Sequence, residues 1–226
     1  MSGGQLVFDL PLTPGMGRED FFETPANRQA LAMVERWPIG DERSPLLIIH
    51  GPPGSGKTHL SEIWRARTGA LKAAPEDILT ANLPALLGGG HLVVEDMQAG
   101  GFDETALFHL INLAREQRAW VLLTAAAPAA QWPVTLPDLK SRLAAAMVAE
   151  ITAPDDELLR AVLVKLFTDR QLRVKEEVIA YLLRRMERSL AAARALVALI
   201  DHAALQRKAE ITRPFVARLL KEKGLT

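Results

Sequence analysis

Eight consecutive residues of this 226-residue chain have the spacing of a phosphate-binding loop. In order, they are Gly51, Pro52, Pro53, Gly54, Ser55, Gly56, Lys57 and Thr58. This run matches the pattern G-x-x-x-x-G-K-S/T in full. The glycines allow backbone N–H groups to turn toward phosphate oxygens. Lys57 would add a positive charge at the β- and γ-phosphates, and the Thr58 hydroxyl could ligate Mg²⁺. The run therefore predicts a site for a nucleoside phosphate.

Two acidic residues at the end of a second apolar segment could serve the same site. Glu95 and Asp96 follow Val94 directly. In P-loop hydrolases the usual order is Asp then Glu, where the first acid helps to hold Mg²⁺ and the second polarises water. The order here is reversed, and aspartate has the shorter reach. We therefore expect a slow ATPase or a protein that stays in one nucleotide state, although acids also commonly end a strand without any catalytic role.

Thr124 and Arg142 are further candidates with less specific signals. Thr124 ends a third apolar segment, where its hydroxyl could contact the γ-phosphate or the attacking water. Arg142 could reach a nucleotide held by a neighbouring subunit and stabilise transition-state charge there. An isolated arginine is also typical of a surface salt bridge. The five histidines show no metal-binding spacing, and Trp64, Trp120 and Trp132 are expected in the core.

The elements that must position these residues follow from hydrophobic patterning. Short apolar runs at 46–49, 92–94 and 120–124 predict buried parallel strands, and helical patterns cover 20–37, 59–67 and 105–117. Strands that alternate with helices indicate a three-layer α/β domain with a parallel sheet. The P-loop stands between the first strand and the second helix, which is the context that its motif requires.

The pattern changes after residue 151. Three or four helices are expected over about 155–170, 175–186, 189–207 and 212–223. We predict a flexible tail over 1–18, an α/β nucleotide-binding domain over 19–151 and a small helical lid domain over 152–226. Residues 1–150 carry 12 Lys/Arg against 17 Asp/Glu, whereas the remainder carries 15 against 10. This modest basic excess is more typical of solvated helix faces than of a DNA-binding surface.

Composition excludes several classes of protein. Hydrophobic residues make up 49% and charged residues 24%, a mixture that can bury a core and is unlike disordered or collagen-like chains. The chain has no cysteine, which excludes disulfides, zinc–thiolate sites and cysteine nucleophiles. The first residues lack the order of a signal peptide, and no apolar span is long enough to cross a membrane. The expected location is the cytoplasm.

These motifs resemble the AAA+ domain of the bacterial replication initiator DnaA in type and order. The segments that carry the resemblance are Phe21-Phe22-Glu23-Thr24-Pro25-Ala26-Asn27-Arg28, the P-loop, Glu95-Asp96, Leu107-Phe108-His109-Leu110-Ile111-Asn112 and Lys140-Ser141-Arg142-Leu143. The lid resembles that of DnaA as well, from Pro154 to Thr212. The resemblance implies that Phe22, Pro25 and Asn27 lie by the adenine and that Arg142 is an arginine finger.

The layout is similar to the Hda family, the regulatory homologues of DnaA. The chain stops at Thr226, which leaves no room for the DNA-reading domain of the initiator. The Hda resemblance implies that the protein binds ADP, joins the DNA-loaded sliding clamp and stimulates hydrolysis of the ATP bound to DnaA, which prevents re-initiation. It would meet DNA only through the clamp and could also form a homo-oligomer.

The N-terminal tail contains a sequence similar to clamp-binding peptides. In such peptides a glutamine and large apolar residues enter pockets on the clamp; here these would be Gln5, Leu6, Phe8 and Leu10. The alternative is an N-terminal strand that packs on the same chain or on a neighbouring molecule.

Some family positions do not match. Alanines follow Thr124 where the family carries polar residues, and the position of the family's sensor arginine in the lid corresponds to Ala191. Arg194 or Arg188, each three residues away, could replace it, and Arg194 is the stronger candidate. These departures favour a regulator with weak hydrolysis of its own. The alternatives are a self-acting P-loop ATPase, such as a helicase loader or DNA-remodelling motor, and then a small-molecule kinase.

Overall fold

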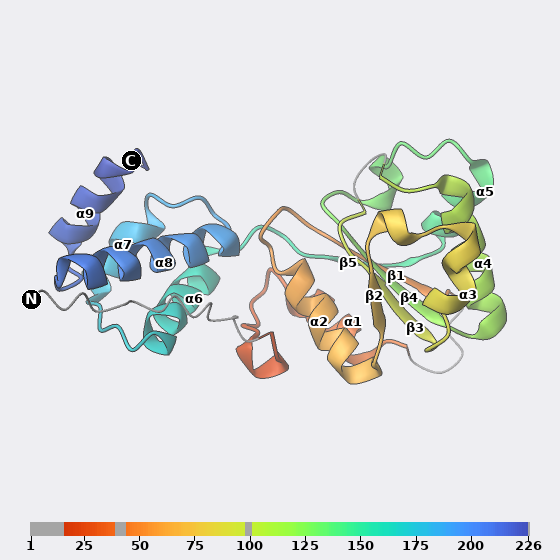
Figure 1. Ribbon diagram of the computed structural model, residues 1–226, viewed down its shortest axis with the longest axis horizontal. Helices are drawn as coiled ribbons and strands as arrows, with labels where there is room; N and C mark the ends of the chain where they lie inside the picture. Colours follow the sequence, from red (N-terminus) through yellow and green to blue (C-terminus); the bar gives the residue numbers. More distant parts are fainter. Residues whose placement is uncertain (1–15, 39–43, 98–100, 226) are drawn as a thin grey trace, which may run out of the picture.

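A five-stranded parallel sheet forms the centre of the N-terminal part of the protein (Figure 1). The computed structural model describes residues 16–38, 44–97 and 101–225. The strands are β1 (Leu46–His50), β2 (Leu71–Ala73), β3 (His91–Val94), β4 (Trp120–Ala125) and β5 (Met147–Glu150). Their order is β2-β3-β4-β1-β5, so the strand that leads into the P-loop lies between β4 and β5. The three predicted strands are confirmed, and the two edge strands were not predicted.

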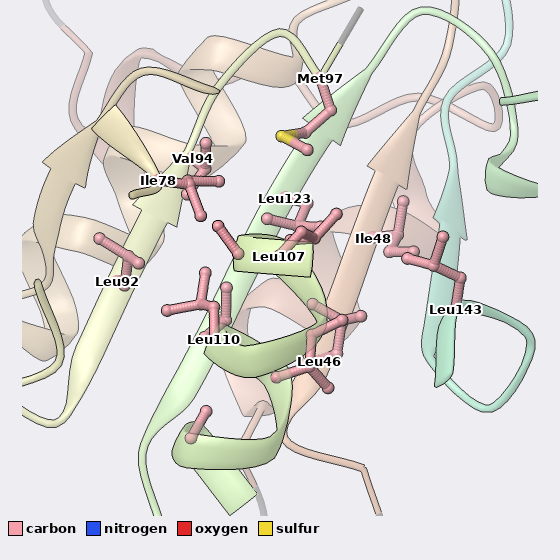
Figure 2. Packing of buried hydrophobic residues seen from close by; sticks show 14 of the residues in the cluster. Leu46, Ile48, Ile78, Leu92, Val94, Met97, Leu107, Leu110, Leu123 and Leu143 are labelled. Atoms are coloured by element: carbon pink, nitrogen blue, oxygen red, sulfur yellow. The ribbon is translucent and has the colours of Figure 1, made fainter. Parts of the chain in front are cut away.

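Helices cover both faces of the sheet. Helices α1 (Arg28–Arg36) and α2 (Lys57–Thr68) pack on one face, and α3 (Leu83–Leu86), α4 (Glu104–Gln117) and α5 (Pro137–Ala144) pack on the other. Successive residues of a strand point to opposite faces. Accordingly Leu46 and Ile48 join the core with α4, while Leu47 and Ile49 join the core with α1 and α2. Figure 2 shows the first of these cores, in which Leu107 and Leu110 of α4 lie against the strands.

The first helix is shorter than predicted. The pattern over 20–37 predicted one helix, but α1 begins only at Arg28 and is preceded by a 3-10 turn over Arg18–Asp20. The reason is local. The Asn27 side chain accepts the N–H of Thr24 at 2.9 Å and donates to the carbonyl of Phe22 at 2.8 Å. Side-chain bonds of this kind offer the backbone an alternative to the helix.

Four helices after residue 151 form the lid, in close agreement with the predicted ranges. They are α6 (Asp156–Asp169), α7 (Glu176–Leu183), α8 (Leu190–Arg207) and α9 (Arg213–Glu222). Asp155, Ser189 and Thr212 cap three of them by accepting a backbone N–H three residues ahead. The lid has a hydrophobic cluster of its own, which includes Phe167, Leu182 and Val197.

The structure confirms the predicted fold class, an α/β three-layer domain with a parallel sheet followed by a helical lid. The division into domains at residues 18 and 151 stays a prediction. Of the three tryptophans expected in the core, Trp64 and Trp132 are buried, whereas Trp120 is half-buried. In the part of the chain that the structure describes, no helix combines the length and the apolar character needed to cross a membrane.

Candidate functional site

The P-loop connects β1 to α2 and has the backbone that its glycines predict. Gly54 and Gly56 have φ of +70° and +108°, values that L side chains rarely adopt. A Cβ at Gly51 would stand 2.2 Å from the carbonyl oxygen of Ile151. The loop therefore requires glycine at these positions, and α2 presents its N-terminal N–H groups directly after it.

The side chain of Lys57 folds back onto the P-loop. Its ammonium donates to the carbonyls of Gly51 at 2.8 Å and Pro52 at 3.0 Å. Burial lowers the pKa of Lys57, and the carboxylate of Asp96 opposes that shift. The lysine and Asp96 are thus close enough to interact, and a phosphate at the loop would meet a positive charge and backbone donors together.

The lid touches the P-loop through the N-terminus of α8. The N–H of Leu190 donates to the carbonyl of Gly54 at 3.0 Å, and the adjacent Ser189 is buried. Arg194 lies one turn further along α8, half-buried, and burial lowers its pKa. This contact places a lid arginine beside the phosphate-binding loop.

Two adjacent cavities lie between the lid and the α/β part. The loop cavity, about 290 Å³, is lined by Pro53, Gly54, Gly56, Lys57, Thr58, Asp96 and residues of α8. The lid cavity, about 180 Å³, has a mixed lining. Its apolar wall is Phe21, Phe22 and residues of α6, and its polar wall includes Asn27, Asp20, Lys165, Asp169 and Arg170. His59, Leu190 and Arg194 line both cavities. The two cavities could together hold a nucleotide, with its phosphates at the loop and its base against the apolar wall of the lid cavity.

The structure brings together most, but not all, of the predicted binding residues. Phe22 and Asn27 line the lid cavity, and Arg194 lines both cavities, whereas Pro25 lines neither. Gly51, Pro52 and Ser55 belong to the loop without lining its cavity. Arg188 pairs with Asp156 at 2.9 Å within the lid, and Ala191 lines the loop cavity.

The two acids after β3 have different surroundings. Asp96 is exposed at the loop cavity, has a φ of +56°, and donates its backbone N–H to the hydroxyl of Thr124 at 3.0 Å. Thr124 is buried and so supports the turn that carries Asp96. Glu95 instead accepts from the ammonium of Lys72 at 2.8 Å through one oxygen and from the hydroxyl of Ser61 through the other.

The arrangement of Glu95 does not fit the predicted Mg²⁺ site. Magnesium takes oxygen ligands in near-octahedral geometry. Both oxygens of Glu95 are engaged, one of them by a cation, and only the exposed Thr58 remains of the predicted ligand pair.

Arg142 lies away from both cavities. It belongs to the last turn of α5, is half-buried, and forms no ion pair within the described residues. The start of α5 is held by Glu104 of α4, whose carboxylate accepts the N–H groups of Thr135 at 2.9 Å and Leu136 at 2.7 Å. These bonds lower the pKa of Glu104. The helix that carries Arg142 is therefore anchored while the guanidinium itself is uncommitted.

His59 is a site residue that sequence reasoning missed. Its Nε2 lies 2.9 Å from the carbonyl of Gly17, and the ring of Phe21 stands edge-on with centroids 5.1 Å apart. Burial lowers the pKa of His59. Next to it, Asp20 pairs with Lys165 of α6 at 3.0 Å and so connects the N-terminal segment to the lid. A single histidine has no spacing that could have signalled this position.

The predicted clamp-binding residues Gln5, Leu6, Phe8 and Leu10 lie outside the described residues.

Comparison with known proteins identifies what the chain is similar to. Residues 155–220 match a family model described as the Hda lid domain. A protein of Haemophilus influenzae described as uncharacterized is 30% identical over 193 residues, which cover 80% of this chain and 83% of that protein.

Two solved structures share the fold at low sequence identity. Domain III of the replication initiation protein DnaA from Thermotoga maritima has a TM-score of 0.78 at 20% identity and covers 94% of this chain and 98% of its own. AMPPCP-bound DnaA from Aquifex aeolicus has a TM-score of 0.67 at 20% identity, with 84% of this chain and 68% of that chain covered.

Proposed function

Because the chain belongs to the Hda-type homologues of DnaA, we propose that it regulates the initiator DnaA by stimulating hydrolysis of DnaA-bound ATP. In this function the protein holds a nucleotide of its own as a structural element. It supplies an arginine to the nucleotide of its partner, and the result would be to prevent re-initiation of replication.

The nucleotide in its own site would be ADP. The phosphates would lie at the P-loop, against Lys57 and the N-terminus of α2, and the adenine would enter the lid cavity beside Phe22 and Asn27. A DnaA structure that shares this fold holds the ATP analogue AMPPCP, which supports an adenine nucleotide. The protein would take up ADP directly rather than produce it, since hydrolysis should be weak with Glu95 paired with Lys72 and Asp96 carrying a short side chain.

Arg142 carries the proposal. An arginine that stabilises the transition state of its own nucleotide would have to line its own cavity, and Arg142 does not. A guanidinium is permanently charged and presents a planar fork of donors to phosphate oxygens. Supplied in trans, such a finger accelerates phosphoryl transfer by about 10³–10⁵. The anchored α5 would hold the base of this side chain in place at the surface of DnaA.

The tail would tether the protein to the sliding clamp. Gln5, Leu6, Phe8 and Leu10 would enter pockets on the clamp as an extended peptide. A tether raises the effective concentration of one partner near the other without a new contact between them. Stimulation would then be limited to clamps already loaded on DNA. DNA itself would be met only through the clamp, in the cytoplasm.

The test is ATP hydrolysis by purified DnaA in the presence of this protein, ADP and DNA-loaded clamp, with each component omitted in turn. We expect stimulation only with all of them present. Arg142→Ala should abolish stimulation and leave ADP and clamp binding unchanged, whereas Lys140→Ala, which removes a positive charge from the same helix, should retain it. Substantial turnover by this protein alone, without stimulation of DnaA, would instead support a self-acting ATPase such as a helicase loader or DNA-remodelling motor.

A further inference from the structure

We propose that Lys72 acts as a built-in counter-ion at Glu95, so that this protein binds its nucleotide without a requirement for Mg²⁺. The inference rests on the proposed nucleotide binding and deepens it. It explains how a P-loop protein could keep a nucleotide while its first acid is unavailable to a metal.

Lys72 lies between two carboxylates at the edge of the sheet. Its ammonium is 2.8 Å from Oε2 of Glu95 and 3.2 Å from Oε1 of Glu62. The position is fixed by strand pairing, since Lys72 of β2 lies opposite Val93 of β3, and Glu95 follows that strand. Glu62 is held in turn by Arg65 at 2.7 Å.

The second oxygen of Glu95 is engaged from the other side. Ser61, one turn into α2 from the P-loop, donates its hydroxyl to Oε1 of Glu95 and also approaches the carbonyl of Thr58. Both oxygens of the carboxylate therefore have partners within the protein. A metal ion could bind Glu95 only by displacing one of them.

Charge and burial favour the pair over a metal. The side chains of Glu95 and Glu62 are 13% and 17% exposed and that of Lys72 is 43% exposed, so solvent screens the attraction between them only in part. The ammonium of Lys72 is positively charged at neutral pH. A divalent cation arriving at Glu95 would meet this charge, and Mg²⁺ gives up its water reluctantly.

The experiment measures the affinity for a fluorescent ADP analogue with EDTA and with millimolar Mg²⁺. For the unaltered protein we expect less than a twofold difference between the two conditions. Lys72→Met keeps the length of the side chain and removes its charge. This variant should bind the analogue at least fivefold more tightly with Mg²⁺ than with EDTA.

Two further variants make the result specific. Lys221→Met removes an exposed lysine of α9 and should behave like the unaltered protein. The double variant Lys72→Met with Glu95→Gln should lose the gained Mg²⁺ dependence, because the carboxylate that Lys72 had occupied is then absent. Thermal unfolding confirms that each variant is folded.

The outcomes separate this inference from the proposed function. Strong Mg²⁺ dependence in the unaltered protein, or none in Lys72→Met, would overturn the role of Lys72 and leave the action on DnaA untouched. Failure of every variant to bind the analogue in either condition would overturn nucleotide binding itself, and with it both proposals.

Discussion

Replacement of Gly54 by alanine should weaken nucleotide binding by loosening the contact between the lid and the P-loop. Gly54 has a φ of +70°, and a Cβ there would stand 2.9 Å from Cβ of Ser189 and 3.3 Å from the backbone nitrogen of Ala191. Real Cβ atoms essentially never approach below 3.0 Å. Because Ser189 and Ala191 belong to the start of α8, the lid must move to admit the methyl group.

The size of the effect can be worked from two contributions. Alanine in the left-handed region costs about 1–2 kcal/mol in the folded state. Displacement of α8 also breaks the 3.0 Å hydrogen bond from Leu190 to the Gly54 carbonyl, worth about 1 kcal/mol. The lost hydrogen bond and the altered shape of the loop cavity weaken the binding of the nucleotide. Since 1.4 kcal/mol corresponds to a factor of ten, we expect the affinity to fall about tenfold.

The assay combines titration with a fluorescent ADP analogue and thermal unfolding. Gly69→Ala is a matched control, because Gly69 has a φ of +71° but a Cβ there would meet nothing within 4 Å. Both variants should lose roughly 2–4 °C in Tm for each kcal/mol of backbone strain. Only Gly54→Ala should lose affinity. If Gly54→Ala bound the analogue as tightly as the unaltered protein, the lid contact would have no part in holding the nucleotide.

Two further predictions concern the tail and His59. Gln5→Ala combined with Phe8→Ala should abolish retention on immobilised clamp and leave ADP binding unchanged; a clamp pull-down that is unaffected would remove the tail from the proposal. Burial holds the pKa of His59 below its usual 6.5, so the unfolded chain takes up the proton first, and stability should fall as pH decreases below about 6.5. His59→Gln should flatten the profile of Tm against pH between about 7.5 and 5.5, and an unchanged slope would contradict this assignment.

The parts of the fold that were predicted depend on short-range sequence. The P-loop is specified by glycines whose φ angles are required within the loop itself, and the central strands are continuous apolar runs because both faces of the sheet are covered. The edge strands β2 and β5 were not predicted because their sequences lack such continuous apolar runs. They are short and only partly buried, with Leu71 and Val148 exposed, so their patterning carries little signal.

Helix α5 was not predicted although its first turn carries local signals. Leu136, at its N-cap, has no side chain that can accept a hydrogen bond, but Pro137 and Asp138 that follow it are typical of a helix start. The part that the sequence does not show is the contact with Glu104 of α4, 32 residues earlier in the chain, which accepts the N–H of Leu136. Arg142 could thus be identified as a candidate, but the contact that anchors its helix could not.

The same limit applies to the chemistry of the site. Glu95 is recognisable as an acid that follows a buried strand, but its pairing with Lys72 depends on an unpredicted strand. His59 is recognisable only as a residue of α2, since its partner Gly17 lies 42 residues earlier. For Glu95 and for His59 the sequence shows the residue type, but it does not show the partner that decides the role of the residue.

In the proposed mechanism one arginine helps to bind the protein's own nucleotide, and another acts on the nucleotide of DnaA. Arg194 lines both cavities from α8, whereas Arg142 lines neither and projects from the opposite face of the sheet to that covered by α2. Hydrolysis at the protein's own nucleotide would need an available acid, and here Glu95 is paired with Lys72, while Arg142 could act only on a nucleotide held by another molecule. In the proposed mechanism the bound nucleotide would affect DnaA through the placement of the lid, which contacts the P-loop at Gly54. Loss of nucleotide affinity in Gly54→Ala should therefore reduce stimulation at subsaturating ADP and leave it intact at saturation, whereas Arg142→Ala should abolish stimulation at every ADP concentration.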